Sequence, residues 1–199
     1  LKDSILLSQD LTNGCGGKIW EAANVMINYF IGKESNGSSL LQNKKIVEVG
    51  SGTGLVGLAM AKLCPSIQEM LLTDQLSMMG LLKENITLNK LESTVKAEIL
   101  NWGEDVPSHM LDADVILASD CIYLEVAFIP LIETLFALTA QKPNETVIYL
   151  AYRKRRSADK RFFQLAKKKF IFEEITDDPQ RLEYQKQKLH LFIVRRKNA

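Results

Sequence analysis

The sequence predicts an α/β protein whose mostly parallel, seven-stranded sheet is doubly wound, with helices on both faces and an antiparallel last strand. Three observations favour this class. Short runs rich in Val, Ile and Leu alternate along the chain with segments of helical periodicity. Several of these runs are apolar throughout, as in strands that are buried on both faces. A glycine-rich turn directly follows the first run, at the kind of position where such sheets bind ligands.

The elements follow one another in a regular order. Apolar residues at helical spacing predict a helix over 16–32, and a polar connector with an Asn-Gly turn signal leads from it to the first strand, at 45–49. The helices predicted after that strand cover 55–63, 78–89, 126–138 and 158–168. The strands that alternate with them cover 69–73, 95–100, 113–119 and 146–152. Two closing strands, near 170–175 and 189–195, have a short connection and are predicted to pair antiparallel.

Composition limits the classes of function. The 199 residues, 46% of them hydrophobic, predict a single domain, with 1–43 covering a ligand site and 44–199 forming the core. Because 25 basic and 24 acidic residues nearly cancel, the net charge favours neither nucleic acid nor a membrane surface. We expect no membrane helix and no leader, since no apolar run approaches about 18 residues. Cys15, Cys64 and Cys121 are odd in number and widely spaced, which predicts a reducing compartment and neither disulfides nor a metal site.

The glycine turn fits two kinds of cofactor. Gly52-x-Gly54-x-x-Gly57 matches the dinucleotide fingerprint, whereas Glu48-x-Gly50-Ser51-Gly52-x-Gly54 favours a cofactor without phosphate. The helix that follows attracts a negative group to the turn. The Glu48 carboxylate would repel a pyrophosphate but attract an amino group, and the methionine end of S-adenosylmethionine offers both charges. The alternative is a glycine-rich turn beside a surface glutamate.

Polar and aromatic residues follow the second and third strands. Asp74 ends the second strand, where a carboxylate binds the hydroxyls of an adenosine ribose; NAD carries the same ribose, and a helix N-cap is the structural alternative. After the third strand, Trp102 offers a face for stacking on adenine and Asn101 a hydrogen bond to its edge. A tryptophan packed in the core is the competing interpretation.

The fourth strand ends in "SDCIY". Asp120 and Tyr123 follow this strand, and a carboxylate beside an aromatic face is suited to a cation such as a lysine ammonium. We therefore predict that Asp120 orients such a cation and that Tyr123 forms a wall of its site. The alternatives are that Asp120 caps a helix beginning near Glu125 and that Tyr123 only packs.

At these residues the sequence resembles the seven-β-strand, class I S-adenosylmethionine-dependent methyltransferases, through the motif "VEVGSGTG". More narrowly it resembles the protein-lysine methyltransferases with an Asp-x-x-Tyr motif, here Asp120 to Tyr123. The resemblance covers nearly the whole chain, from "GCGGKIWEAA" to "HLFIVRRK". It implies a Rossmann-like fold, S-adenosylmethionine as cofactor, and methyl transfer to a lysine side chain of a folded protein.

The resemblance also implies roles for single residues. Trp20 is expected against the cofactor, Gly50, Ser51 and Gly52 at its methionine end, and Asp74 at its ribose. Trp102 is expected at the adenine, and Ser119, where relatives often have Ala, is expected to line the pocket.

The substrate implied by the resemblance is less specific. Known substrates in the group include translation elongation factor 1-alpha, a 70-kDa chaperone and a AAA ATPase, valosin-containing protein. The stretches "AYRKRRSADKRFF" and "HLFIVRRK" are most similar to the fungal elongation factor 1-alpha lysine methyltransferases, which implies a cytoplasmic enzyme with possible access to the nucleus. The basic run from Arg153 to Arg161 predicts a docking patch for an acidic protein surface, with a solvated helix start or a localisation signal as alternatives.

Three other functions remain open on the sequence. A nicotinamide-dependent dehydrogenase would use the same fingerprint but would place Glu48 beside a pyrophosphate. A nucleic-acid methyltransferase is disfavoured because such enzymes commonly share a Pro-Pro-Tyr loop where this chain has Cys-Ile-Tyr. An inactive interaction module is disfavoured by the intact glycine turn together with Asp120 and Tyr123.

Overall fold

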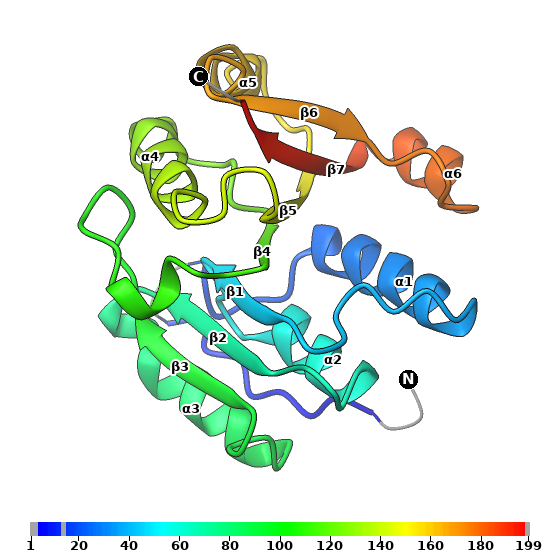
Figure 1. Cartoon of the computed structure of the whole chain (residues 1–199), viewed down its shortest axis with the longest axis vertical. Helices are drawn as coiled ribbons and strands as arrows, with labels where there is room; N and C mark the ends of the chain where they lie inside the picture. The colour runs from blue at the N-terminus through cyan, green and yellow to red at the C-terminus, as the bar shows by residue number, and fades with distance from the viewer. Residues whose placement is uncertain (1–3, 13–14, 198–199) are drawn as a thin grey trace.

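A seven-stranded sheet forms the centre of the molecule (Figure 1), as seen in a computed structural model that describes residues 4–12 and 15–197. The strands are β1 (Lys45–Val49), β2 (Glu69–Asp74), β3 (Val95–Ile99), β4 (Val115–Ser119), β5 (Val147–Arg153), β6 (Phe170–Glu174) and β7 (Leu189–Arg196). Their order is β3-β2-β1-β4-β5-β7-β6; β1 to β5 pair in parallel, and β7 pairs antiparallel with both β5 and β6. Because the order reverses between β1 and β4, the loops after these strands border one crevice.

Helices cover both faces of the sheet. They are α1 (Glu21–Ser35), α2 (Leu55–Leu63), α3 (Met79–Leu88), α4 (Phe128–Leu138), α5 (Asp159–Ala166) and α6 (Arg181–Lys186), with short 3-10 turns η1 (Leu76–Met78), η2 (Ser108–Met110) and η3 (Glu125–Ala127). One core joins α1, α2 and α3 to the sheet, and a second core joins α4 and α5 to the opposite face. Figure 1 shows this division, with α1 on the right of the sheet and α4 on the left. The predicted doubly wound fold is confirmed.

The alternation of side chains along β1 decides what each face receives. Ile46 is buried in the core beneath α1 to α3, whereas Val47 and Val49 are buried in the core beneath α4 and α5. Successive side chains of a strand point to opposite faces, so Glu48 falls on the same face as Ile46. A carboxylate is thereby placed in an apolar layer, where burial of a large side chain ordinarily stabilises by about 1.5–3 kcal/mol and burial of a charge is unfavourable.

Two predicted elements differ from the structure. The helix predicted over 16–32 begins only at Glu21. The backbone before it crosses the chain's own N-terminal segment, where the Asp10 N–H donates to the Gly17 carbonyl at 3.2 Å and a Cβ at Gly17 would lie 1.8 Å from the Asp10 carbonyl oxygen. The connection between the last two strands is not short, because it contains α6, a helix without buried residues that hydrophobic periodicity cannot reveal. Gly14, which opens the stretch "GCGGKIWEAA", lies outside the described residues.

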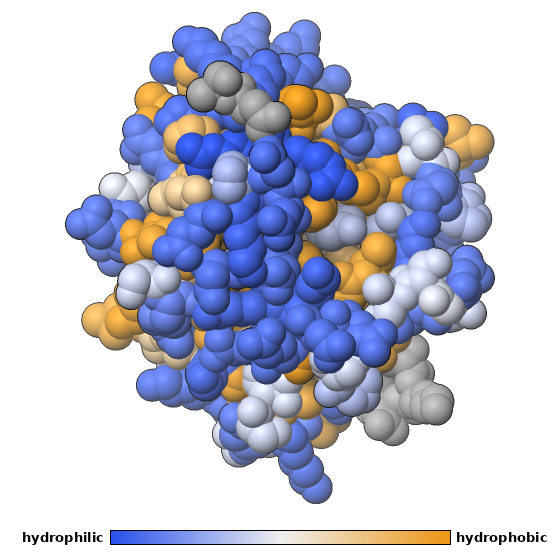
Figure 2. Space-filling view, in the orientation of Figure 1, coloured by the Kyte–Doolittle hydropathy of each residue, from blue (hydrophilic) through white to orange (hydrophobic). Residues whose placement is uncertain are grey.

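The surface is mainly polar on the face that Figure 2 shows, where apolar side chains lie in separate patches between hydrophilic ones. Within residues 4–12 and 15–197, no helix is both long and apolar enough to cross a membrane.

Candidate active site

The glycine loop after β1 has a backbone that only glycine adopts readily. Gly50, Gly52 and Gly54 have φ values of 62°, 55° and 78°, in the left-handed region. A Cβ at Gly50 would lie 2.8 Å from the Trp102 ring, and a Cβ at Gly52 would lie 2.6 Å from the Gly16 carbonyl oxygen. The loop is held at Ser51, whose N–H donates to the Thr73 carbonyl at 3.0 Å and whose carbonyl accepts from the Gly54 N–H at 2.8 Å. The sequence therefore needs glycine here for the shape of the loop and for its close approach to Trp102 and to the backbone of Gly16.

Glu48 is buried beneath α2 rather than on the surface, so the interpretation as a surface glutamate is wrong. Its side chain is 2% exposed and accepts a hydrogen bond from the Gly57 N–H at 2.9 Å, which caps a helix whose N-cap residue, Gly54, has no side chain. Loss of hydration raises the pKa of Glu48 to about 8, and the Asp74 charge acts in the same direction. Its predicted contact with a cofactor amino group stays a prediction.

Gly57 explains the third glycine of the dinucleotide fingerprint without a dinucleotide. A Cβ there would lie 2.2 Å from a Leu72 methyl group and 2.8 Å from Glu48 Oε2. Gly57 therefore lets α2 pack closely against β2 and lets its own N–H reach Glu48. Helix–sheet packing therefore accounts for Gly57, the last glycine in the match to the dinucleotide fingerprint.

Asp74 ends β2 beside the glycine loop. Its Oδ2 accepts from the Gly52 N–H at 2.8 Å and its Oδ1 from the Gln75 N–H at 2.7 Å. Loss of hydration raises the pKa of Asp74, while these two hydrogen bonds lower it. The residue that caps η1 is Gln75, so Asp74 does not serve as that helix's N-cap. Its carboxylate instead braces the glycine loop at the crevice.

The aromatic candidates lie on two sides of this loop. Trp102 is half-buried against the core of α4 and α5, with its ring next to Gly50. The Asn101 side-chain amide donates to Glu104 at 3.0 Å in this structure. Trp20 directly precedes α1 and its indole N–H donates to the Cys15 carbonyl at 3.0 Å.

Asp120 is a buried acidic residue with a cationic partner from its own chain. It has a φ of 58° and is 7% exposed. Both of its carboxylate oxygens accept hydrogen bonds from the Arg155 guanidinium, at 2.7 and 2.5 Å. Oδ1 also accepts from the Arg153 N–H at 3.3 Å. This two-point geometry is the strongest form of the carboxylate–guanidinium interaction. The sequence interpretation missed Arg155, because the basic run was assigned to docking as a whole.

The surroundings of Asp120 contradict the helix-cap alternative. The residue that caps η3 is Leu124, and no side chain caps this turn. Tyr123 is 42% exposed, and the Arg156 guanidinium donates to its carbonyl oxygen. Burial raises the pKa of the Tyr123 hydroxyl to about 12, with Cys15 contributing in the same direction. Asp120 is therefore free of a capping role and faces the cationic groups around it.

A polar group without a partner lies at the end of β4, on the same edge of the sheet as the glycine loop. The Ser119 Oγ is buried and has no hydrogen-bond partner among the residues that the structure describes. A buried hydroxyl without a partner costs about 1–3 kcal/mol unless a ligand or water satisfies it. Together with the glycine cradle and the Asp74 carboxylate, it provides polar groups on both sides of the point where the strand order reverses.

Solved structures with this fold include methyltransferases. A putative RNA methyltransferase from Pyrococcus horikoshii aligns with a TM-score of 0.64 at 13% identity, covering 96% of this chain and 93% of that one. A putative tRNA (m1A22) methyltransferase from Streptococcus pneumoniae, solved in complex with S-adenosyl-L-methionine, aligns with a TM-score of 0.59 at 12% identity, covering 92% and 75%. At such identities the likeness concerns the fold alone, which is the Rossmann-like fold of class I methyltransferases.

Sequence comparison then gives the family. Residues 1–169 match the family model described as "Lysine methyltransferase", so the chain belongs to this family. It is 39% identical to the protein-lysine N-methyltransferase EFM6 of Saccharomyces cerevisiae, covering 93% of this chain and 82% of the relative. It is 32% identical to the protein N-lysine methyltransferase METTL21A of Danio rerio, covering 89% and 79%. The chain is thus a protein-lysine N-methyltransferase, and its family implies the use of S-adenosylmethionine. The dehydrogenase interpretation falls away.

Proposed function

We propose that this enzyme methylates a lysine of a folded protein, translation elongation factor 1-alpha, with S-adenosylmethionine as methyl donor. One observation carries the proposal: Asp120, a buried carboxylate at the end of β4, already binds a cationic side chain beside the glycine loop. A site that accepts a guanidinium through two hydrogen bonds has the charge and polarity that a lysine ammonium needs.

The cofactor side of the crevice is assigned from its groups. S-adenosylmethionine supplies a methyl group made electrophilic by its positive sulfur. The residues that we assign to its binding are Trp20, Glu48, Gly50, Ser51, Gly52, Gly54, Asp74, Asn101, Trp102 and Ser119. Asp74 accepts the ribose hydroxyls, Trp102 stacks on the adenine with Asn101 at its edge, and the glycine loop receives the methionine end. The Ser119 hydroxyl, which has no hydrogen-bond partner within residues 4–12 and 15–197, is assigned to the same ligand.

The lysine side of the crevice has to supply a neutral amine. A free lysine has a pKa of about 10.4, so its deprotonation at pH 7 costs about 4–5 kcal/mol. A desolvated channel beside a positive sulfur lowers that pKa, while Asp120 raises it. We therefore assign Asp120 to orienting the nitrogen and not to strong base catalysis. Tyr123, half-exposed next to it, forms the wall of the channel.

The substrate assignment rests on sequence likeness. Residues 151–163 and 190–197 are most similar to the fungal elongation factor 1-alpha lysine methyltransferases. Residues 153–161 lie on the loop and helix that follow β5, beside Asp120, and we assign them to contact with an acidic face of the substrate. A substrate of the translation machinery implies a cytoplasmic enzyme. A chaperone or a AAA ATPase would be methylated by the same chemistry.

Labelled cofactor tests the proposal directly. The enzyme is incubated with labelled S-adenosylmethionine and lysate from cells that lack it, and labelled proteins are identified by mass spectrometry. We expect one dominant band, elongation factor 1-alpha, with the label on a lysine and no label with Asp120→Asn. Label on another protein would replace the substrate, and label on nucleic acid or on no macromolecule would contradict the proposed function.

A further inference from the structure

Two adjoining hollows beside Asp120 are lined mainly by basic and polar side chains. Their volumes are about 430 and about 490 Å³, and both are lined by Lys154, Arg155 and Lys188. We call the Lys and Arg residues that line them the basic groove: Arg153, Lys154, Arg155, Arg156, Lys160, Lys186 and Lys188. The docking patch predicted from the sequence contains only one wall of this groove, because Lys186 and Lys188 lie about thirty positions further along the chain.

The two walls are fixed to each other. The loop between β5 and α5 forms one wall, and the turn between α6 and β7 forms the other. The Lys154 N–H donates to the Lys188 carbonyl at 2.8 Å. The buried Asp159 carboxylate accepts from the Arg155 and Arg156 N–H groups at 3.0 and 3.2 Å. The backbone of the groove is therefore hydrogen-bonded, and its side chains are presented on a defined frame.

The groove carries surplus positive charge. Arg153 pairs with Glu21 and Lys186 with Glu183, and Arg156 lies 4.0 Å from Asp159. Within the described residues, Lys154, Lys160 and Lys188 form no ion pair, which leaves a cluster of unneutralised cations. Such a cluster favours an anionic partner.

Arg155 connects this groove to the proposed lysine site. Its two terminal guanidinium nitrogens donate to the Asp120 carboxylate. The guanidinium also lies 5.2 Å from the centre of the Trp20 ring, and Arg155 lines both hollows. The Asp120 carboxylate is 3% exposed, so Arg155 shields most of what an entering ammonium must reach. A second cation at Asp120 would also be repelled by this guanidinium.

We propose that the basic groove binds an acidic segment of the protein substrate and that Arg155 is thereby a specificity-determining residue. A substrate carboxylate in the groove takes over the guanidinium of Arg155, and Asp120 becomes available to the lysine nitrogen. The enzyme thereby selects lysines near acidic residues, because only such a segment supplies both a carboxylate for Arg155 and an amine for Asp120. The inference rests on the proposed function. It adds to that function the second wall of the groove, an acidic segment as the ligand, and the exchange of partners at Arg155.

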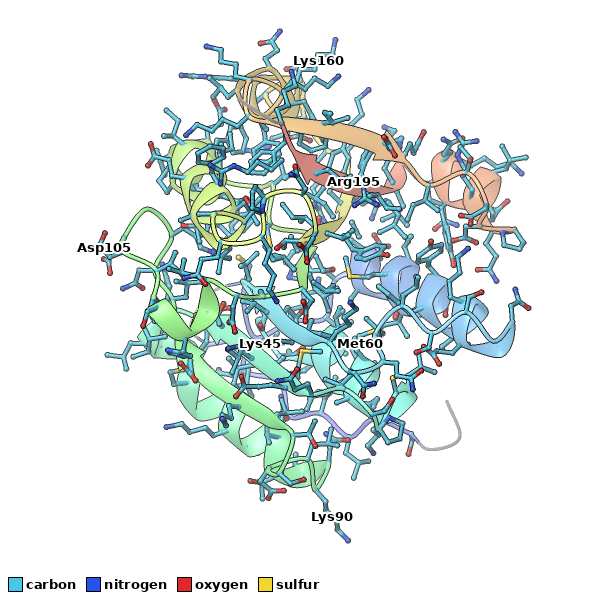
Figure 3. All side chains as sticks on the ribbon, viewed as in Figure 1. Lys45, Met60, Lys90, Asp105, Lys160 and Arg195 are labelled. Carbon is cyan, nitrogen blue, oxygen red and sulfur yellow. The ribbon has the colours of Figure 1, made fainter. Side chains whose placement is uncertain are left out.

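Binding is tested without catalysis. Hexaglutamate and hexaglutamine are titrated by calorimetry into the full chain, the groove variant Lys154→Gln/Lys188→Gln and the control Lys83→Gln/Lys90→Gln, which loses the same charge. Figure 3 shows Lys90 at the opposite end of the molecule from Lys160. We expect hexaglutamate to bind and hexaglutamine not to bind. Hexaglutamate should bind the groove variant about tenfold more weakly than it binds the control. Equal binding by the two variants, or tighter binding of a hexanucleotide than of hexaglutamate, would overturn the proposal.

The exchange at Arg155 is tested with two forms of folded elongation factor 1-alpha that differ only in Glu or Gln residues around the methylated lysine. We expect the unchanged enzyme to methylate the Glu form with about tenfold higher kcat/KM, and Arg155→Gln to lose most of this preference. A purely structural role for Arg155 would lower both rates and leave their ratio unchanged, which contradicts the exchange. If neither form is methylated while cofactor and hexaglutamate both bind, the proposed function fails and the groove's ligand stands.

Discussion

The two sides of the crevice hold their buried carboxylates in different ways. On the cofactor side, Glu48 is covered by α2 and satisfied by one backbone N–H, and its pKa is raised to about 8. On the substrate side, Asp120 is also buried, but its carboxylate accepts two hydrogen bonds from a guanidinium. The partner of Glu48 belongs to a helix backbone and is fixed, whereas the partner of Asp120 is a side chain that can leave.

This difference concerns the partner that holds each carboxyl group. Burial beneath α2 raises the pKa of Glu48 to about 8, whereas Asp120 contacts a cationic side chain from the loop after β5. Two acidic residues that look alike in the sequence therefore have different surroundings, and variants can test each side separately.

The largest expected effect is on the substrate side. Asp120→Ala removes the group that orients the amine, so we expect turnover to fall about a hundredfold or more, which corresponds to about 3 kcal/mol. Cofactor affinity, measured by calorimetry, should change by less than about threefold. Asp120→Asn is the matched variant, since asparagine tolerates the same positive φ. Equal losses of turnover and cofactor affinity would place Asp120 with the cofactor.

The pH dependence of stability tests Glu48. Its pKa is higher in the folded chain, at about 8, than in the unfolded chain, so the folded state holds more protons between pH 4.5 and 8. The contribution of Glu48 is complete below pH 4.5 and is lost as the pH rises to 8. Relative to Glu48→Gln, the unchanged protein should lose up to about 3 kcal/mol of unfolding free energy from pH 5 to pH 8. Denaturant titrations that run parallel over this range would contradict the assignment.

The fit of α2 against the sheet gives a smaller effect. Gly57→Ala places a methyl group 2.2 Å from Leu72, so α2 must move outward and weaken the hydrogen bond to Glu48. We expect a loss of about 1–3 kcal/mol in unfolding free energy, measured by urea denaturation. Gly80→Ala is the control, because a Cβ there meets nothing within 4 Å and alanine favours a helix. Similar results for both variants would remove the packing explanation of the third glycine.

The smallest effect belongs to the surface pair between Arg153 and Glu21, which links β5 to the first turn of α1. Both side chains are substantially exposed, at 40% and 55%, so water screens the pair. A double-mutant cycle with Arg153→Gln and Glu21→Gln should give a coupling below about 1 kcal/mol. A larger coupling would mean that the N-terminal helix is held to the substrate side more tightly than exposure indicates.

Most of the fold is readable from the sequence because the same signals repeat. Apolar runs set β2, β4 and β5, and the limits of α2 follow directly from the glycine turn and the apolar pattern after it. The start of α1 was misplaced because Gly16 and Gly17 continue an apolar-looking pattern into a segment that crosses the N-terminal residues. Helix α6 was missed because it buries no side chain.

The sequence predicted which candidate residues follow the strands, but not which residues they pair with. The strand ends gave Asp74, Trp102 and Asp120 because parallel strands bring their carboxyl ends to one edge. The partner of Asp120 lies 35 positions away, within a run of basic residues that spacing alone does not distinguish. Burial of Glu48 was also beyond the sequence, since it depends on which face of β1 receives α2.

The place of β7 has a consequence for synthesis. This strand lies between β5 and β6, although the ribosome completes both of them first. In a nascent chain the edges of β5 and β6 that pair with β7 therefore stay unpaired until β7 is synthesised. Unpaired strand edges can associate with other chains. The loop that carries Arg155 is fastened by the Lys188 carbonyl, which also emerges late. The half to which we assign S-adenosylmethionine can thus fold while the half to which we assign lysine selection is still being translated.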